Sequence, residues 1–330
     1  MTISSIDIVG AGAWGTALAA LARETGLTVR LWAHEDEVAR AINETGENPQ
    51  YLAGITLPEG IEATNDLAAM GRGDAVLLVT PAQHLREIAA RLASNLAPGA
   101  PVVVCAKGIE QATGALMTEV CAEVLPTAPL AVLSGPTFAA EVARGRPTAV
   151  TVAARDETLA DALVAALGCA RFRPYAARDV IGAEVGGALK NVIAVACGIA
   201  EGLAFGDNAR AALITRGLAE ITRFAVAKGA EPATLSGLSG LGDLVLTATS
   251  TQSRNYSLGL EVGKGGRAAD ILASRRTVAE GAYTAGAAAR LADGLGIDMP
   301  IAAAVDRIIN QDADVRAVVE ELLARPFRRE

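Results

Sequence analysis

Lys190 is the one charged residue in the stretch between Glu184 and Glu201, inside the apolar run GGALKNVI. An unpaired lysine is costly to bury, and burial lowers its pKa. A lysine in such surroundings can exchange a proton with a ligand near neutral pH. Gly186 and Gly187 stand about one helical turn earlier and are expected to leave backbone room for that ligand. The alternative is a structural lysine whose stem follows the apolar surface until its ammonium group reaches water.

A second group of polar residues follows at Asp243 and at the adjacent Ser253, Arg254 and Asn255. Asp243 comes directly after a glycine-containing turn. The other three place a hydroxyl, a guanidinium and an amide side by side. Arginine suits bidentate contact with phosphate, and hydroxyls and amides add directional hydrogen bonds. The group therefore indicates an anion site. The alternative is that Asp243 caps a helix and Arg254 is a solvated surface residue.

Three glycines near the start of the chain, Gly10, Gly12 and Gly15, form a GxGxxG pattern directly after the apolar run Ile3–Val9. In such a pattern the first glycine permits a tight turn, the second lets the backbone approach a pyrophosphate, and the third permits close packing of helix on strand. A helix that starts here also offers free N–H groups and a positive dipole end. The pattern predicts dinucleotide binding, with a plain glycine-rich turn as the alternative.

The second strand should end near Trp32, where an acidic side chain favours NAD and a cation favours NADP. The chain continues Ala33-His34-Glu35-Asp36. His34 can serve either cofactor, or can be an exposed loop histidine. The choice between NAD and NADP therefore stays open.

Two further loops follow predicted strands in the first half of the chain. Lys107-Gly108 follows Val102–Cys105, and a turn with the sequence SGPTF follows Ala131–Leu133. Ligands bind at the carboxyl ends of the strands in open parallel sheets, so both loops are candidate ligand contacts. Ordinary strand-end turns are the alternative.

The elements that position these residues change character near residue 180. The first half alternates short apolar runs with helical segments such as Thr16–Glu24 and Leu85–Leu96, which favours a parallel sheet covered on both faces. The expected strands are Ile3–Val9, Thr28–Trp32, Ala75–Val79, Val102–Cys105, Ala131–Leu133 and Ala149–Val152.

The second half has helical patterns and few strand signals. The expected helices are Val185–Ala204, Ala209–Gly229, Thr284–Leu295 and Ile301–Asn310. We therefore predict an α/β Rossmann-like N-terminal domain with a predominantly parallel sheet over residues 1–182. An all-α substrate and catalytic domain should follow over residues 183–330, joined to the first by a shared helix.

Composition sets limits on function. The 330 residues are 51% hydrophobic and 20% charged, with a formal net charge of −8. There is no overall basic footprint for nucleic acid and no polybasic membrane patch. The start of the chain lacks the features of a secretory signal, and Val185–Ala200 is too short for a membrane span. The four cysteines form no CxxC pair, so no metal site is indicated. These features predict a reduced cytoplasmic protein.

From Ile8 to about Pro300 the chain resembles the bacterial-type NAD(P)-dependent glycerol-3-phosphate dehydrogenases. The ordered motifs are GAGAWGTALA, LWAH, CAKGIE, SGPTFAAEV, GGALKNVIAVACG, ARAALITRGLAE, GLGDLVLTATSTQSRN and the weaker VAEG. The resemblance implies reversible reduction of dihydroxyacetone phosphate to sn-glycerol 3-phosphate with NAD(P)H, which supplies phospholipid synthesis. It also implies a homodimer.

The resemblance assigns roles to individual residues. Lys190 matches the catalytic lysine, which exchanges a proton with the substrate C2 oxygen. The matched substrate contacts are Lys107, Gly135, Thr137, Asp243, Ser253, Arg254 and Asn255, with Arg254 at the phosphate. Besides the three glycines, the matched cofactor contacts are Ala13, Trp14, His34, Lys107, Ala139, Arg254, Val278 and Glu280.

Two other functions fit parts of the pattern. A related two-domain dehydrogenase of the β-hydroxyacid or 6-phosphogluconate type would share the glycine loop and a lysine on a helix. A non-catalytic NAD(P)-sensing protein would keep the glycine loop but would need neither Lys190 nor the anion group.

Overall fold

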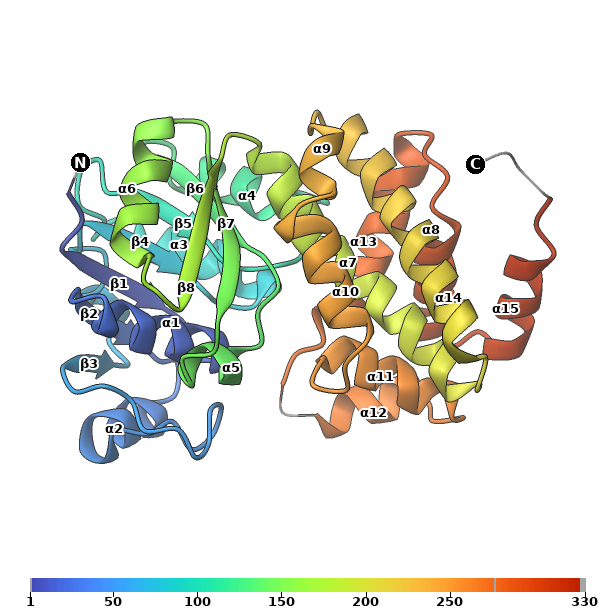
Figure 1. Cartoon of the computed structure of the whole chain (residues 1–330), viewed down its shortest axis with the longest axis horizontal. Helices are drawn as coiled ribbons and strands as arrows, with labels where there is room; N and C mark the ends of the chain where they lie inside the picture. Colours follow the sequence, from blue (N-terminus) through green and yellow to red (C-terminus); the bar gives the residue numbers. More distant parts are fainter. Residues whose placement is uncertain (1, 276, 327–330) are drawn as a thin grey trace. The chain divides into compact units, whose positions relative to one another are not determined.

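The computed structural model describes residues 2–275 and 277–326 of the chain (Figure 1). The chain divides into two compact units. The sheet unit comprises Met1–Lys107 and Leu116–Glu184, and the helical unit comprises Gly108–Ala115 and Val185–Glu330. Helix α7 (Val180–Gly202) begins in the first and ends in the second. Our assignment of cofactor binding to residues 1–182 and of catalysis to residues 183–330 stays a prediction.

Among the described residues, the sheet unit contains one eight-stranded sheet. Its strands are β1 (Ser5–Val9), β2 (Thr28–Trp32), β3 (Ile61–Thr64), β4 (Ala75–Leu78), β5 (Val102–Val104), β6 (Leu130–Ser134), β7 (Thr148–Ala154) and β8 (Phe172–Ala177). Their spatial order is β3-β2-β1-β4-β5-β6-β7-β8. The chain order reverses between β1 and β4, which is where open parallel sheets bind ligands.

The predicted α/β class with a mostly parallel sheet is confirmed, although two strands were missed. In this described sheet, β6 and β7 alone pair antiparallel. Strand β3 has the sequence IEAT and buries only alternate residues, so it lacks the continuous apolar run of its neighbours. Strand β8 carries Arg173 and Pro174. A proline weakens a strand pattern but is tolerated at a sheet edge.

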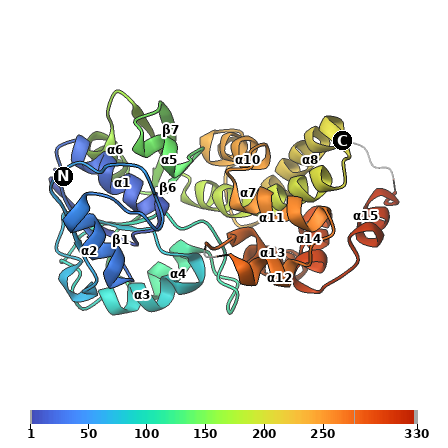
Figure 2. The same ribbon diagram turned by 90° about the horizontal axis from the view of Figure 1, so that it is seen from below.

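Helices cover both faces of this sheet. They are α1 (Ala13–Glu24), α2 (Asp36–Thr45), α3 (Leu85–Leu92), α4 (Met117–Val124), α5 (Ala139–Ala143) and α6 (Glu157–Leu167). Helices α1 and α6 lie on one face, and α3 and α4 lie on the other (Figure 2). Strand residues such as Ile6, Ile8 and Leu31 are fully buried, as expected for a sheet covered on both sides.

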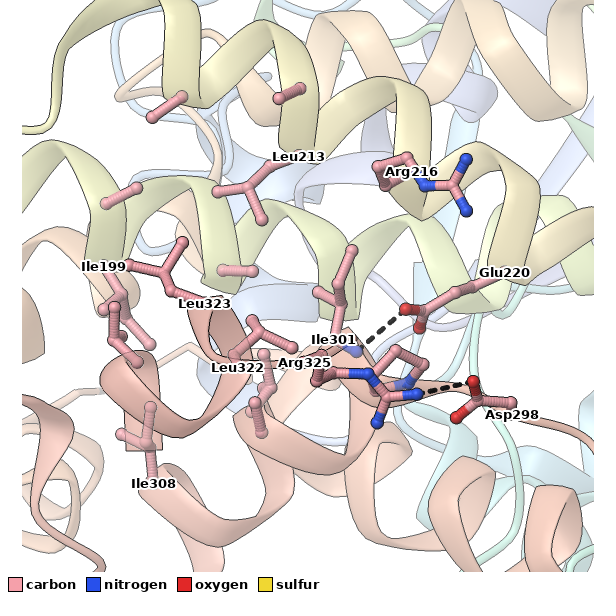
Figure 3. Close-up of a pocket in the computed structure, with 18 of the residues that line it drawn as sticks. Ile199, Leu213, Arg216, Glu220, Asp298, Ile301, Ile308, Leu322, Leu323 and Arg325 are labelled. Atoms are coloured by element: carbon pink, nitrogen blue, oxygen red, sulfur yellow. Dashed lines mark hydrogen bonds and ion pairs between the residues drawn. The ribbon is translucent and has the colours of Figure 1, made fainter. Parts of the chain in front are cut away.

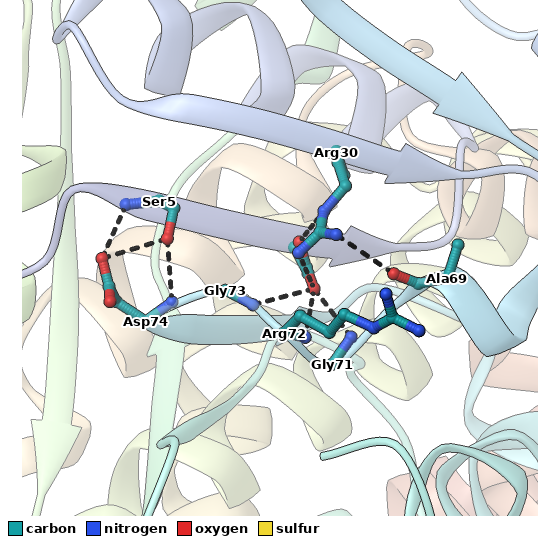
Figure 4. A network of polar contacts seen from close by, with 8 residues as sticks. Ser5, Arg30, Ala69, Gly71, Arg72, Gly73 and Asp74 are labelled. Carbon is teal, nitrogen blue, oxygen red and sulfur yellow. Dashed lines mark hydrogen bonds and ion pairs between the residues drawn. The ribbon is translucent and has the colours of Figure 1, made fainter. Parts of the chain in front are cut away.

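The buried carboxylate of Asp7 ties β1 to β2 and to the turn before β4 (Figure 4). Its side chain is 1% exposed and forms an ion pair with Arg30 at 2.8 Å. Its Oδ2 accepts the backbone N–H groups of Gly71, Arg72 and Gly73 at 2.7, 2.9 and 3.1 Å. A buried charge needs such partners. The network therefore stabilises the strand pairing from which the glycine loop emerges.

The helical unit contains no strand among its described residues, as predicted for the second half of the chain. After α7, its helices are α8 (Gly206–Ala227), α9 (Pro232–Leu235), the π-helical turn η3 (Leu238–Gly242), α10 (Asp243–Ala248), α11 (Arg254–Gly263), α12 (Ala268–Ser274), α13 (Glu280–Gly294), α14 (Pro300–Asn310) and α15 (Val315–Leu323). The four helices expected from the sequence correspond to α7, α8, α13 and α14.

Glycines allow α7 and α11 to pack with their backbones in close approach. A Cβ added to Gly198 of α7 would lie 2.1 Å from the carbonyl oxygen of Tyr256. A Cβ added to Gly259 of α11 would lie 2.1 Å from the carbonyl oxygen of Val195. Helix axes can come this close only where the side chains at the crossing are absent. This contact places the start of α11, with Arg254, beside the helix that carries Lys190.

Helix α7 is the one described helix long and apolar enough to cross a membrane by length and composition. In the structure, 89% of its most apolar window is buried. Such burial is typical of a core helix, which can be apolar all round.

Candidate active site

The glycine loop between β1 and α1 has a backbone geometry that requires glycine at two positions. Gly10 has φ +120°, and a Cβ there would lie 2.9 Å from backbone atoms of Val79. A Cβ on Gly15 would lie 1.8 Å from the carbonyl oxygen of Gly10. The first glycine thus makes the turn, and the third lets α1 pack against it.

The start of α1 suits an anionic ligand. Gly12 is the N-cap of α1 and provides no side-chain cap, and a Cβ built on it would meet nothing within 4 Å. The first N–H groups of a helix, here those of Ala13 and Trp14, have no acceptor within the helix. Open space above uncapped N–H groups fits the pyrophosphate of a dinucleotide. The buried Nε1 of Trp14 also has no hydrogen-bond partner among the described residues.

The segment after β2 carries the side chains that could meet the adenosine end of a dinucleotide. His34 is exposed, and its ring lies 6.0 Å from that of Trp32 in an edge arrangement. Asp36 forms an ion pair with Arg40 at 2.8 Å. Ala33, which continues the strand pairing through the carbonyl oxygen of Thr64, is buried. This geometry does not choose between NAD and NADP.

Three predicted substrate residues of the sheet unit meet at one carbonyl group. Gly135 follows β6 with φ +151°. Its carbonyl oxygen accepts a hydrogen bond from Lys107 Nζ at 3.1 Å and from Thr137 Oγ1 at 3.3 Å. Ala139 begins α5 shortly afterwards. The two strand-end loops expected from the sequence therefore lie together, with a half-buried ammonium group between them.

In the helical unit, Lys190 is buried and paired. The residue is 6% exposed, which excludes the surface-reaching alternative. Its ammonium group forms an ion pair with Asp243 and donates a hydrogen bond to Thr247 Oγ1 at 2.8 Å. Asp243 and Thr247 lie one turn apart on α10. Asp243 therefore uses its carboxylate to hold Lys190.

The expected role of Gly186 is wrong. A Cβ on this residue would lie 2.6 Å from the carbonyl oxygen of Ser239. The missing side chain makes room for the backbone of the Leu238–Gly242 turn, so this space does not hold a ligand. The glycine instead lets the turn that leads into Asp243 approach α7.

The start of α11 is fixed by hydrogen bonds that involve two of the predicted residues. Ser253 is the N-cap and accepts the N–H of Tyr256 at 3.2 Å. Asn255 Nδ2 donates to Asn191 Oδ1 at 2.9 Å, and Asn255 Oδ1 accepts the N–H of Gly281 at 2.9 Å. Asn191 is the neighbour of Lys190, so these bonds hold α11 and the start of α13 beside the lysine.

Arg254 and Glu280 interact electrostatically in the same region. Arg254 is exposed, as its alternative interpretation required. Partial desolvation of its guanidinium nevertheless lowers its pKa, and the charge of Glu280 opposes this. Val278 lies half-buried just before Glu280. The predicted residues Ser253, Arg254, Asn255, Val278 and Glu280 thus come from two adjoining helix starts.

Sequence reasoning missed Thr247 and Asn191. Both touch predicted residues through side-chain hydrogen bonds. Thr247 is four residues after Asp243, a spacing that places two residues on one helix face. Asn191 follows Lys190 directly. These sequence positions relative to Asp243 and Lys190 were the signals that could have identified Thr247 and Asn191 as part of the site.

A cavity of about 930 Å³ lies elsewhere in the helical unit (Figure 3). Side chains of α7, α8, α14 and α15 line it, including Ile199, Leu213, Glu220 and Leu322. The Glu220 carboxylate accepts the N–H groups of Ile301 and Ala302 at 2.8 and 3.2 Å. None of the predicted site residues lines this cavity.

Comparisons with known proteins cover both units. A family model described as NAD-dependent glycerol-3-phosphate dehydrogenase N-terminus matches residues 5–160, and one described as the C-terminus matches residues 179–320. Glycerol-3-phosphate dehydrogenase [NAD(P)+] of Rhodospirillum rubrum is 60% identical over 99% of this chain and 94% of its own length.

Solved structures give the same result. Glycerol-3-phosphate dehydrogenase from Coxiella burnetii is 40% identical, with a TM-score of 0.93 over 98% of this chain and 99% of that one. The enzyme from Saccharomyces cerevisiae is 27% identical, with a TM-score of 0.83 over 97% of this chain and 99% of that one.

Proposed function

Because the chain belongs to the NAD-dependent glycerol-3-phosphate dehydrogenase family, we propose that it interconverts dihydroxyacetone phosphate and sn-glycerol 3-phosphate with NADH or NADPH. The resemblance read from the ordered motifs is thereby confirmed. Membership of an NAD(P)-dependent enzyme family also removes the non-catalytic sensing protein as an alternative.

The observation that carries the proposal is the buried contact of Lys190 with Asp243 and Thr247. Reduction of a carbonyl group at C2 leaves negative charge on its oxygen. A positioned ammonium group stabilises that charge and then protonates the oxygen. Lys190 performs this step, while Asp243 keeps the ammonium group charged and Thr247 orients it. In the reverse direction the neutral Lys190 amine accepts the proton of the C2 hydroxyl and becomes the ammonium group that pairs with Asp243.

The cofactor supplies the hydride when bound. The N–H groups at the start of α1, those of Ala13 and Trp14, would hold its pyrophosphate. His34 would contact its adenosine end. The remaining cofactor contacts of the proposal are Lys107, Ala139, Arg254, Val278 and Glu280.

Cationic and polar groups bind the phosphate end of the substrate in this proposal. Arg254 provides the main charge, since a guanidinium binds phosphate in bidentate fashion. Lys107 adds a second charge that offsets the dianion within an acidic protein. Gly135, Thr137, Ser253 and Asn255 supply directional hydrogen bonds.

The product supplies glycerophospholipid synthesis, and the enzyme acts in the cytoplasm as a homodimer. These statements follow from the family resemblance. Size-exclusion chromatography with light scattering tests the dimer, and a mass equal to one chain would contradict it.

An oxidation assay tests the activity. NADH and NADPH are each offered with dihydroxyacetone phosphate, with unphosphorylated dihydroxyacetone, and with acceptors of the β-hydroxyacid and 6-phosphogluconate enzymes. We expect oxidation with dihydroxyacetone phosphate and much slower oxidation with the unphosphorylated analogue. Preference for one of the other acceptors would overturn the proposal.

A further inference from the structure

A turn formed by residues 48–52 of the sheet unit reaches the glycine loop at one end. Asn48 is fully buried. Its Nδ2 donates hydrogen bonds to the carbonyl oxygen of Ala11 and to Thr16 Oγ1, both at 2.8 Å. The Thr16 hydroxyl in turn donates to the Ala11 carbonyl at 3.2 Å. The turn is therefore anchored under the loop that receives the pyrophosphate.

The other end of the same turn reaches the segment after β2. Asn48 Oδ1 accepts the N–H of Tyr51 at 3.1 Å, and the Tyr51 hydroxyl donates to Glu35 Oε1 at 2.8 Å. Burial and the bond to Glu35 raise the pKa of Tyr51, so the hydroxyl keeps its proton at neutral pH. One turn thus connects Ala11 with the Glu35 carboxylate through hydrogen bonds made by Asn48 and Tyr51.

The position of that carboxylate matters because the segment after the second strand meets the ribose 2′ group of a dinucleotide. A carboxylate there accepts a hydrogen bond from the 2′-hydroxyl of NAD and repels the 2′-phosphate of NADP. In this chain the residue directly after β2 is Ala33, and its side chain carries no charge. The first carboxylates after β2 in the sequence are those of Glu35 and Asp36. Asp36 is paired with Arg40.

We propose that Tyr51 is a specificity-determining residue that retains the Glu35 carboxylate on the residue 48–52 turn, so that the 2′-phosphate of NADP is tolerated alongside the 2′-hydroxyl of NAD. This inference rests on the NAD(P) use in the proposed function. Loss of the Tyr51 hydroxyl releases the charged side chain of Glu35, which lies two residues beyond Ala33, the residue directly after β2. The released carboxylate then repels ligands with a 2′-phosphate and does not weaken ligands that carry a 2′-hydroxyl.

The test uses two fragments that differ in the 2′-phosphate, namely 2′,5′-ADP and 5′-AMP. Their dissociation constants are measured by calorimetry for the unaltered protein, Tyr51→Phe, Glu35→Gln and the double variant. We expect Tyr51→Phe to weaken 2′,5′-ADP about fivefold with no loss of affinity for 5′-AMP, the size of an interaction between partly solvated charges. In the Glu35→Gln background the tyrosine substitution should have no effect, because no charge remains to be released.

Tyr175→Phe is the matched control. Tyr175 lies on β8 at the far edge of the same sheet and is 48% exposed. Melting temperatures of all variants show whether each is folded. An equal loss of both fragments in Tyr51→Phe, an unchanged ratio, or an effect that persists in the double variant would overturn the proposal. Failure of the unaltered protein to bind either fragment would overturn it as well.

Turnover distinguishes this inference from the proposed function. If the fragment ratio shifts as expected but dihydroxyacetone phosphate is not reduced, the proposed reaction fails and the role of Tyr51 stands. If reduction occurs and the ratio does not shift, the reaction stands and the role of Tyr51 fails.

Discussion

Lys190 and Asp243 form an ion pair inside the helical unit, with side chains that are 8% and 0% exposed. Removing one partner of such a pair leaves an uncompensated buried charge, which is strongly destabilising. The Asp243 carboxylate places an opposite charge beside the Lys190 ammonium group, and a close opposite charge favours the charged form of a lysine over the neutral amine. This gives the ammonium group its proposed role as the proton donor.

Lys190→Ala should lose most of the turnover while the cofactor still binds. General acid catalysis contributes typically 10²- to 10⁴-fold, so we expect a loss of kcat of about that size. The measurement is kcat with dihydroxyacetone phosphate, together with the dissociation constant of NADH. Near-normal turnover would refute the assigned role. Because the substitution leaves Asp243 buried without its partner, a melting curve must accompany the assay.

Thr247→Val should lower kcat with little change in KM. Valine has nearly the shape of threonine but cannot accept the hydrogen bond of Lys190 Nζ, so the ammonium group loses the bond that orients it from this side. We expect a decrease of about tenfold, equivalent to about 1.4 kcal/mol. Thr247→Ser keeps the hydroxyl and should restore most of the rate. If the serine variant is as slow as the valine variant, a hydroxyl at this position is not sufficient for the rate, and the positioning role of the Thr247 hydroxyl is contradicted.

Arg254→Ala should raise KM for dihydroxyacetone phosphate at least tenfold, because a charged hydrogen bond to phosphate contributes about 1.5–3 kcal/mol. Reduction of unphosphorylated dihydroxyacetone should change little. Arg267→Ala is the matched control, since Arg267 lies in the same unit and pairs with Asp312 on the exposed surface. An unchanged KM and kcat in Arg254→Ala would contradict the assignment to the phosphate.

Gly259→Ala should destabilise the protein, because the new methyl group would meet the carbonyl of Val195 on α7. Overpacking of this kind costs about 1–3 kcal/mol. A lower melting temperature and a lower kcat are expected together, since the start of α11 must shift away from Lys190. Gly294→Ala is the control: a Cβ there meets nothing within 4 Å. Equal melting temperatures for the two variants would show that the helix contact tolerates a methyl group.

The sequence predicted the parts of the site that local patterns encode. The GxGxxG spacing, the isolated Lys190 and the Ser253–Asn255 group each stand out within a few residues of chain. The structure gives Gly10 a positive φ and Gly15 a crowded position against the Gly10 carbonyl, which is why no other residue type serves at these two positions. Roles in binding and catalysis stay predictions because no ligand contact tests them.

What local patterns could not supply were contacts made by packing distant elements. The Thr247 hydroxyl meets Lys190 only because α10 packs on α7, 57 residues apart in sequence. The position of Gly186 one turn before Lys190 is the same whether the space left by its missing side chain holds a ligand or the Ser239 carbonyl. The sequence alone therefore does not distinguish the two roles. Strand β8 is recognisable only from its place at the sheet edge, where Pro174 is tolerated.

Glu220→Gln should flatten the dependence of stability on pH between about pH 4.5 and pH 7. Burial raises the pKa of Glu220 from 4.5 to about 7, against the opposing hydrogen bonds from Ile301 and Ala302. A raised carboxyl pKa means that the folded state holds the proton more tightly than the unfolded chain. The stabilisation is therefore complete below about pH 4.5 and is lost as the pH rises through about 7, by up to about 3 kcal/mol.

Urea unfolding at several pH values measures this effect for the unaltered protein, Glu220→Gln and the control Glu37→Gln, an exposed residue of α2. The Glu220→Gln variant should keep some slope, because burial also raises the pKa of Glu184 to about 7. The control should retain the full slope. If Glu220→Gln shows the same slope as the unaltered protein, the Glu220 carboxylate is already ionised and stabilised by the N–H groups at the start of α14, and burial does not dominate its pKa.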